Sequence, residues 1–103
     1  NDDELPLLDW IYFGLYHSEK GMCAYTYGMR MFGKLEMEVL DSAASPQELR
    51  DFLYAIAGYV LDQDVTLNDG ETIGFSAEEK LPITCAEGHS LDQKMLQIGY
   101  QPA

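Results

Sequence analysis

The sequence predicts a two-layer α+β domain, in which a mostly antiparallel sheet of about five strands packs against one long helix. Three observations lead to this prediction. Short segments in which apolar and polar residues alternate stand both before and after a single segment of helical periodicity. The helical segment opens with residues that cap helices, and turn-forming residues separate the alternating segments. The expected order of elements is therefore β-β-β-α-β-β-β.

The length of 103 residues fits one domain with a single core. We expect residues 1–7 to form an acidic lead-in or linker and residues 8–103 to form the single α+β domain. The chain begins at Asn1 and not at Met. We therefore expect it to be the C-terminal part of a longer protein.

The first half of the chain reads as three strands. Residues 8–16 are rich in aromatic residues and predict a strand, residues 17–21 are polar and predict a turn, and residues 22–32 predict a second strand antiparallel to the first. After Gly33 the apolar residues alternate with Glu36 and Glu38. This pattern predicts a half-exposed third strand with both glutamates on the exposed face.

The helix has the clearest signal in the chain. Ser45 is a typical N-cap, Pro46 suits the first helical position, and Glu48 completes a capping box. Apolar residues then recur at helical spacing. The stripe that we expect to face the sheet consists of Leu49, Phe52, Leu53, Ile56 and Val60.

The remaining strands follow the turn signal Asn-Asp-Gly at residues 68–70. Residues 72–75 predict a fourth strand, and the alternation in residues 81–85 predicts a fifth. Pro82 places that fifth strand at an edge of the sheet, because proline has no N–H to donate. Residues 95–100 predict a short last strand.

The charge of the chain excludes two classes of partner. Eighteen Asp and Glu against six Lys and Arg give a net charge of -12, which repels both nucleic acid and anionic membrane surfaces. The same charge attracts a basic protein. No apolar run reaches the length of a membrane span.

The two cysteines, Cys23 and Cys85, are expected to be free thiols, with a disulfide left open if their strands are neighbours. Free thiols fit a reducing compartment, and we therefore expect a cytoplasmic location.

No motif for catalysis or for a cofactor emerges from the sequence. The expected first hairpin would allow Cys23 and His17 to come close enough for a nucleophile and base, but no third group orients them. The acidic residues 62–71 lack the glycine and glutamate spacing of a calcium loop, the histidines and cysteines lack a zinc spacing, and the glycines form no phosphate loop. We predict no catalytic residue, no cofactor and no metal.

Three segments carry a resemblance to a known family: YGMRMFGKLEMEVLDS, then SPQELRDFLYAIAGYVL, and then NDGETIGFSAEEKLPIT. In this order they resemble the bacterial family catalogued as domain of unknown function 4261, over roughly Ala24 to Tyr100. The resemblance implies no activity and no catalytic residue, and it implies that the unit is the C-terminal portion of a longer chain. The strand pattern is more distantly similar to suppressor-of-fused-like proteins, some of which are bacterial immunity proteins.

The function that these observations favour is a non-enzymatic protein-interaction or regulatory domain. Its partner is expected to be a basic protein or the upstream domain of the same chain. The alternatives are an immunity-type protein that neutralises a basic toxin, an accessory part of an enzyme whose site lies mainly upstream, and a purely structural domain. The residues predicted for the interaction surface are Arg30, Glu36, Glu38, Glu71 and Ser76.

Overall fold

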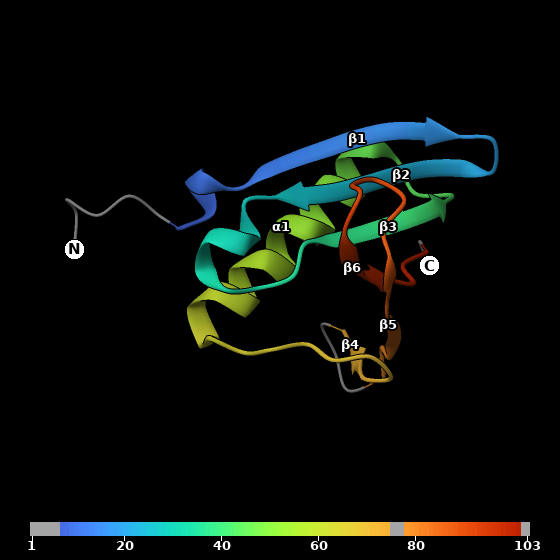
Figure 1. The fold of residues 1–103 in the computed structure, drawn as a ribbon. Helices are drawn as coiled ribbons and strands as arrows, with labels where there is room; N and C mark the ends of the chain where they lie inside the picture. The colour runs from blue at the N-terminus through green and yellow to red at the C-terminus, as the bar shows by residue number, and fades with distance from the viewer. Residues whose placement is uncertain (1–6, 75–77, 102–103) are drawn as a thin grey trace.

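Six strands form one mixed sheet in the computed structural model, which describes residues 7–74 and 78–101 (Figure 1). The strand order across the sheet is β1-β2-β3-β6-β5-β4. Neighbouring strands are antiparallel except β3 and β6, which are parallel. The strands are β1 (Tyr12–Ser18), β2 (Gly21–Tyr27), β3 (Met37–Ser42), β4 (Thr72–Ile73), β5 (Leu81–Glu87) and β6 (Lys94–Ile98). The predicted α+β class and the predicted order β-β-β-α-β-β-β are confirmed, with six strands in place of about five.

The single α-helix, α1 (Pro46–Gln63), begins where the sequence predicts. The Ser45 hydroxyl accepts from the Glu48 N–H at 3.2 Å, and the Glu48 carboxylate accepts from the Ser45 N–H at 3.0 Å. This reciprocal pair satisfies two N–H groups that the first helical turn cannot. The predicted stripe is buried, together with Ala57 and Leu61.

One helix cannot cover a sheet of six strands. An α-helix is about 10–12 Å across with its side chains, whereas six strands at about 4.8 Å spacing span roughly 24 Å. Accordingly α1 packs against β1, β2 and β3. The other half of the sheet is crossed by the segment from Asp64 to Glu71, which hydrogen-bonds to β5 through Gly70 and Glu71. In Figure 1 this segment is the yellow-orange chain that leads from the helix to β4.

The predicted second strand is longer than the observed one, and the predicted third strand begins earlier than the observed one. The second strand ends at Tyr27, because Gly28 adopts φ 124° and a 3₁₀-helix, η2 (Met29–Phe32), follows it. Only glycine takes that φ readily. The third strand starts at Met37, and another 3₁₀-helix, η1 (Leu7–Trp10), stands where the first strand was expected to begin.

Two expectations for the last strands are also corrected. β4 has two residues and not four, and the predicted position Phe75 lies outside the described residues. The prediction that Pro82 marks an edge strand is wrong, because β4 pairs beyond β5 and Thr72 lies opposite Pro82. The ladder tolerates this proline because β4 is only two residues long and the neighbouring Ile83 N–H donates to the Glu71 carbonyl instead.

The two cysteines are free thiols, as expected. Cys23 lies on β2 and Cys85 on β5, and strands β3 and β6 separate them. A bond between them is therefore excluded by distance. Within residues 7–74 and 78–101, no helix is both long and apolar enough to cross a membrane.

We predict that the substitution Ser45→Ala lowers the free energy of unfolding by about 1 kcal/mol, because it removes the acceptor for the Glu48 N–H. Urea denaturation followed by circular dichroism measures this change. The control is Ser45→Thr, which keeps the hydroxyl and is expected to stay within about 0.5 kcal/mol of the parent. An equal loss in both variants would show that the cap does not stabilise α1.

Candidate functional site

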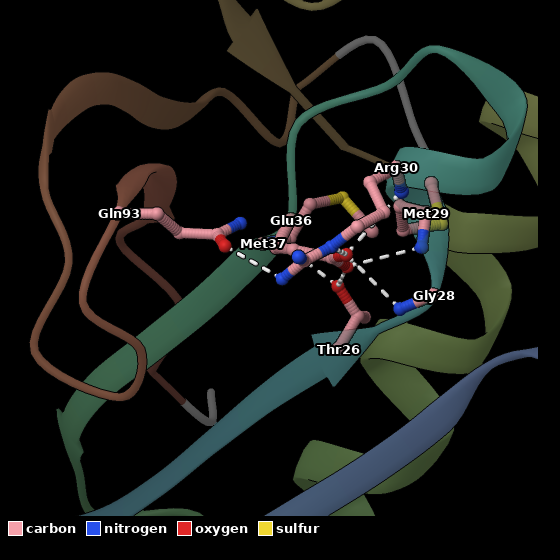
Figure 2. Close-up of polar contacts among 7 residues, drawn as sticks. All are labelled: Thr26, Gly28, Met29, Arg30, Glu36, Met37 and Gln93. Carbon is pink, nitrogen blue, oxygen red and sulfur yellow. Dashed lines mark hydrogen bonds and ion pairs between the residues drawn. The ribbon is translucent and has the colours of Figure 1, made fainter.

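Glu36 is fully buried, with 0 % of its surface exposed, and its carboxylate is surrounded by hydrogen-bond donors. The Thr26 hydroxyl donates to it at 2.9 Å. The backbone N–H groups of Gly28, Met29 and Arg30 donate at 2.9, 3.1 and 3.3 Å (Figure 2). A carboxylate in a protein interior requires such compensation for lost hydration.

The local sequence explains why these donors converge. Because Gly28 has φ 124°, the chain turns sharply out of β2 and aims three successive N–H groups at one point, which forms an anion-binding nest at the start of η2. A side chain at Gly28 would also collide with the Trp10 carbonyl, 2.6 Å from an ideal Cβ. Thr26 fixes the other side, since its hydroxyl also accepts from the Met37 N–H at 2.9 Å. Glu36 therefore acts as an internal anion for this nest.

Glu38, two residues on, is buried to the same extent and holds a different segment. Its carboxylate accepts from the His89 N–H at 3.2 Å, from the Ser90 N–H at 2.9 Å and from the Gln97 side-chain amide at 2.9 Å. His89 and Ser90 belong to the loop of residues 88–93 between β5 and β6. This loop folds back across the sheet, close to the buried Met95, whose sulfur lies 2.3 Å from an ideal Cβ on Gly88.

Arg30 connects the two carboxylate sites. Its guanidinium lies 3.6 Å from the Glu36 carboxylate on one side and donates to the Gln93 side-chain oxygen at 2.6 Å on the other. Figure 2 shows the Arg30 side chain extending between Glu36 and Gln93. The turn after β2 and the loop of residues 88–93 are thus held together by one exposed arginine.

Tyr16 anchors the same loop from β1. Its hydroxyl and that of Ser90 are 2.9 Å apart and hydrogen-bonded. Burial raises the pKa of Tyr16, the bond to Ser90 opposes this change, and the neighbouring Cys23 and Glu38 raise the pKa further. The hydroxyl is thus kept protonated and is poorly suited to act as a base.

Four tyrosines lie on one side of the β1–β2 hairpin, and we call them the tyrosine face. The strand register places Tyr12, Tyr16, Tyr25 and Tyr27 on this side, opposite the side where Phe13 meets α1. The Tyr25 ring lies 6.1 Å from Tyr12 and 6.2 Å from Tyr16, measured between ring centroids. The Arg30 guanidinium stacks 4.6 Å from the Tyr27 ring centroid.

Gly14 is what lets the central ring of this face lie flat. An ideal Cβ at Gly14 would be 2.2 Å from the Tyr25 ring, so any other residue would push the ring away. The tyrosine face is therefore a continuous aromatic surface over the backbone of β1.

The structure separates the residues that the sequence predicted for an interaction surface. The expectation that Glu36 and Glu38 lie on an exposed strand face is wrong. Both side chains are fully buried, and the N–H groups described above donate to their carboxylates. Arg30 is exposed as expected. Glu71 is also exposed, but it lies in the turn between α1 and β4, where it accepts from the Asn68 N–H. Ser76 lies outside the described residues.

The histidine and cysteine of the first hairpin do not form a catalytic pair. His17 lies opposite Met22 and Cys23 lies opposite Tyr16, and successive pairs in a ladder face opposite sides of the sheet. In the described ranges 7–74 and 78–101, no group of three or more His, Cys, Asp and Glu side chains is placed to hold a metal ion.

Sequence reasoning missed the donors around the two glutamates and the tyrosine face. The signal for the first was Gly28 directly after a strand whose last two residues are Thr26 and Tyr27, a few residues before a glutamate flanked by Leu35 and Met37. The donors to Glu38 had no local signal, because they come from residues 89, 90 and 97. The tyrosine face follows from the β1–β2 register alone.

Comparison with known families bears on this arrangement. The family described as "Domain of unknown function (DUF4261)" matches residues 25–98. The chain belongs to the DUF4261 family. The matched region of this DUF4261 domain includes both buried glutamates and the loop of residues 88–93, whereas β1 precedes it. Comparison with curated proteins and with solved structures found no match.

We predict that Glu36→Gln and Glu38→Gln each lower the free energy of unfolding by about 2–4 kcal/mol, because each replaces a charged acceptor with an amide that also presents N–H groups to N–H donors. Urea denaturation measures the loss. The matched control is Glu19→Gln at an exposed turn position, which is expected to change stability by less than about 0.5 kcal/mol.

Amide hydrogen exchange distinguishes the two sites within this prediction. Glu38→Gln is expected to speed exchange at His89 and Ser90 while leaving Gly28 and Met29 protected, and Glu36→Gln is expected to do the reverse. Uniformly faster exchange in both variants would contradict the assignment of one segment to each carboxylate.

We predict that the protein loses stability as the pH rises above about 10, the usual tyrosine value. The pKa values of Tyr16 and Tyr100 are raised in the fold, chiefly by burial. Above pH 10 the unfolded chain therefore releases these protons first and is favoured. Urea denaturation at pH 8 to 11 measures the slope, and Tyr16→Phe should reduce it. An unchanged slope in Tyr16→Phe would contradict the contribution of Tyr16.

Proposed function

We propose that this DUF4261 domain is a non-catalytic protein-interaction domain that binds an extended basic segment of a partner protein along β1. The observation that carries the proposal is the character of β1 as an unprotected edge strand. The partner segment would add a seventh strand, with main-chain hydrogen bonds for affinity and the tyrosine face for side-chain contacts.

Within the residues that the structure describes, β1 lacks the proline, charged residues and bulges by which proteins usually shield an edge strand. Its residues YFGLYHS include no proline, lysine, aspartate or glutamate, and its register with β2 is continuous over seven pairs. Large apolar side chains are exposed on it, Tyr12 at 61 % and Leu15 at 37 %, and Trp10 at the end of η1, just before it, is 55 % exposed. Such an edge is a template for pairing with another extended chain.

The tyrosine face supports binding of a positively charged segment in particular. Aromatic side chains are enriched at interfaces, and the faces of their rings attract lysine and arginine. The cation–π contact that Arg30 already makes with Tyr27 is the same interaction within the protein. A partner strand beside β1 would place every second side chain on this face.

Charge complementarity favours a basic partner over a second copy of the chain. Two copies would each carry a net charge of -12, and exposed Asp9, Glu19 and Asp41 lie on segments next to the hairpin. Like charge opposes self-association and accelerates the approach of a basic chain.

The non-catalytic character and a cytoplasmic location belong to the same proposal. Support for the first is that His17 and Cys23 face opposite sides of the sheet, and that Tyr16 is kept protonated. Support for the second is that both cysteines are free thiols, which suits a reducing compartment.

We predict that selection from a display library of random dodecapeptides enriches basic peptides that bind beside β1. Bound peptides should shift the NMR signals of the β1 backbone amides, and affinity should fall as salt increases. Tyr12→Lys is expected to weaken binding by about tenfold or more, because it adds a repelling charge to the edge. Isothermal titration calorimetry measures the affinities.

Tyr59→Lys provides the matched control. Tyr59 lies on α1 and is 48 % exposed, so the same substitution there adds the same charge away from β1 and should leave the affinity within about twofold. Acidic or neutral peptides, amide shifts away from β1, or equal losses in the two variants would contradict the proposal. Dimerisation of the chain that Tyr12→Lys abolishes would instead identify a second copy as the occupant.

A further inference from the structure

A hollow of about 420 Å³ lies on the helix side of the sheet, beside the C-terminal end of α1. It is enclosed by the end of α1, the turn after η2, the segment of residues 65–69, and side chains of β5 and β6. The walls are mainly apolar, and they include the buried Met29, Met37, Val60 and Leu96 and the half-buried Leu67. This volume lies within the range of sites for small organic molecules, about 300–1,000 Å³.

The hollow is a consequence of the mismatch between one helix and six strands. The segment of residues 64–71 crosses the half of the sheet that α1 leaves uncovered. Two hydrogen bonds hold it to β5. The Cys85 N–H donates to the Asp69 carboxylate at 2.8 Å, and the Gly70 N–H donates to the Ile83 carbonyl at 2.9 Å. A single extended segment has fewer side chains to fill the space than a second helix would have. Space therefore remains beneath it.

Among the described residues, the charged groups that line the hollow offer an anion no free partner. The Lys34 ammonium lies 2.9 Å from the Asp64 carboxylate, and its side chain is only 12 % exposed. The Asp69 carboxylate lies at the exposed rim, where one of its oxygens accepts from the Cys85 N–H. Any charged ligand would lose part of its hydration among the apolar walls.

We propose that this hollow is a binding site for a small, uncharged, apolar organic molecule, such as a medium-chain alcohol. Apolar cavities hold water poorly and accept apolar guests, and Lys34, the cationic side chain among the described lining residues, is already paired with Asp64. The site is independent of the edge-strand function, because it lies on the other face of the sheet from the tyrosine face and is lined by other residues.

The test is an NMR titration of the 103-residue chain with decan-1-ol, with decanoate and decylammonium as ligands of equal length and opposite charge. Decan-1-ol is expected to bind saturably, to shift the methyl signals of Met29 and Met37, and to bind at least about tenfold more tightly than either ion. Tighter binding of decanoate would mean that Lys34 leaves Asp64 to pair with the ligand. Tighter binding of decylammonium would mean that the acidic residues at the rim determine the ligand charge. Either result would overturn the proposal. Binding that does not saturate would overturn it as well.

Two variants locate the site. Leu67→Trp places a larger side chain in the hollow and is expected to weaken decan-1-ol binding by about tenfold or more, whereas Leu15→Trp on β1 is expected to leave it unchanged. Lys34→Met keeps the apolar stem and removes the charge, and it should bind decan-1-ol at least as tightly as the parent. Circular dichroism checks the folding of each variant. If Leu67→Trp does not fold, the affinity of Lys34→Met for decan-1-ol still tests the location of the site. Equal affinity of the parent and Leu67→Trp, or loss of binding in Lys34→Met, would overturn the assignment.

Discussion

Two carboxylates buried beside the sheet determine how the irregular parts of this domain are arranged. Glu36 gathers three successive N–H groups of the turn after β2, and Glu38 gathers two from the loop before β6. An ionised carboxylate is tolerated in a protein interior only when donors replace its water. Both segments are therefore held in place by the donors that each carboxylate requires, and Met29 and Met95, which lie next to them, are fully buried.

The two proposed binding regions arise from one asymmetry. On one side of the sheet, α1 covers β1, β2 and β3. Among the described residues, the extended segment of residues 64–71 covers the rest of that side, and a hollow remains beneath it. On the opposite side the loop of residues 88–93 covers the centre of the sheet and reaches the β1–β2 hairpin at Tyr16, but it leaves Tyr12 and Tyr27 exposed. The edge of β1 and the end of the tyrosine face at Tyr12 and Tyr27 are therefore not covered by this loop.

Most of the fold could be predicted from the sequence, because its signals are local. The capping box at Ser45 and Glu48 located the start of α1, and the alternating segments gave the order of elements. The alternation of Glu36 and Glu38 with apolar residues was misleading, because a buried glutamate with distant donors has the same local pattern as a solvated one. The donors to Glu38 lie about fifty residues away along the chain, and the parallel pairing of β3 with β6 that brings them near leaves no mark in either strand.

The position of β6 has a consequence for how the chain folds. β6 follows every other strand in the sequence but lies in the middle of the sheet, between β3 and β5. Before β6 inserts, no strand pairing joins the part made of β1–β3 and α1 to the part made of β4 and β5. Glu38 then has no donor from residues 89, 90 or 97. In a half-assembled sheet Glu38 is therefore hydrated by water, and its carboxylate can be buried at low cost only when these donors arrive. Closing so long a loop slows folding, and the exchange of water for protein donors at Glu38 is coupled to the insertion of β6.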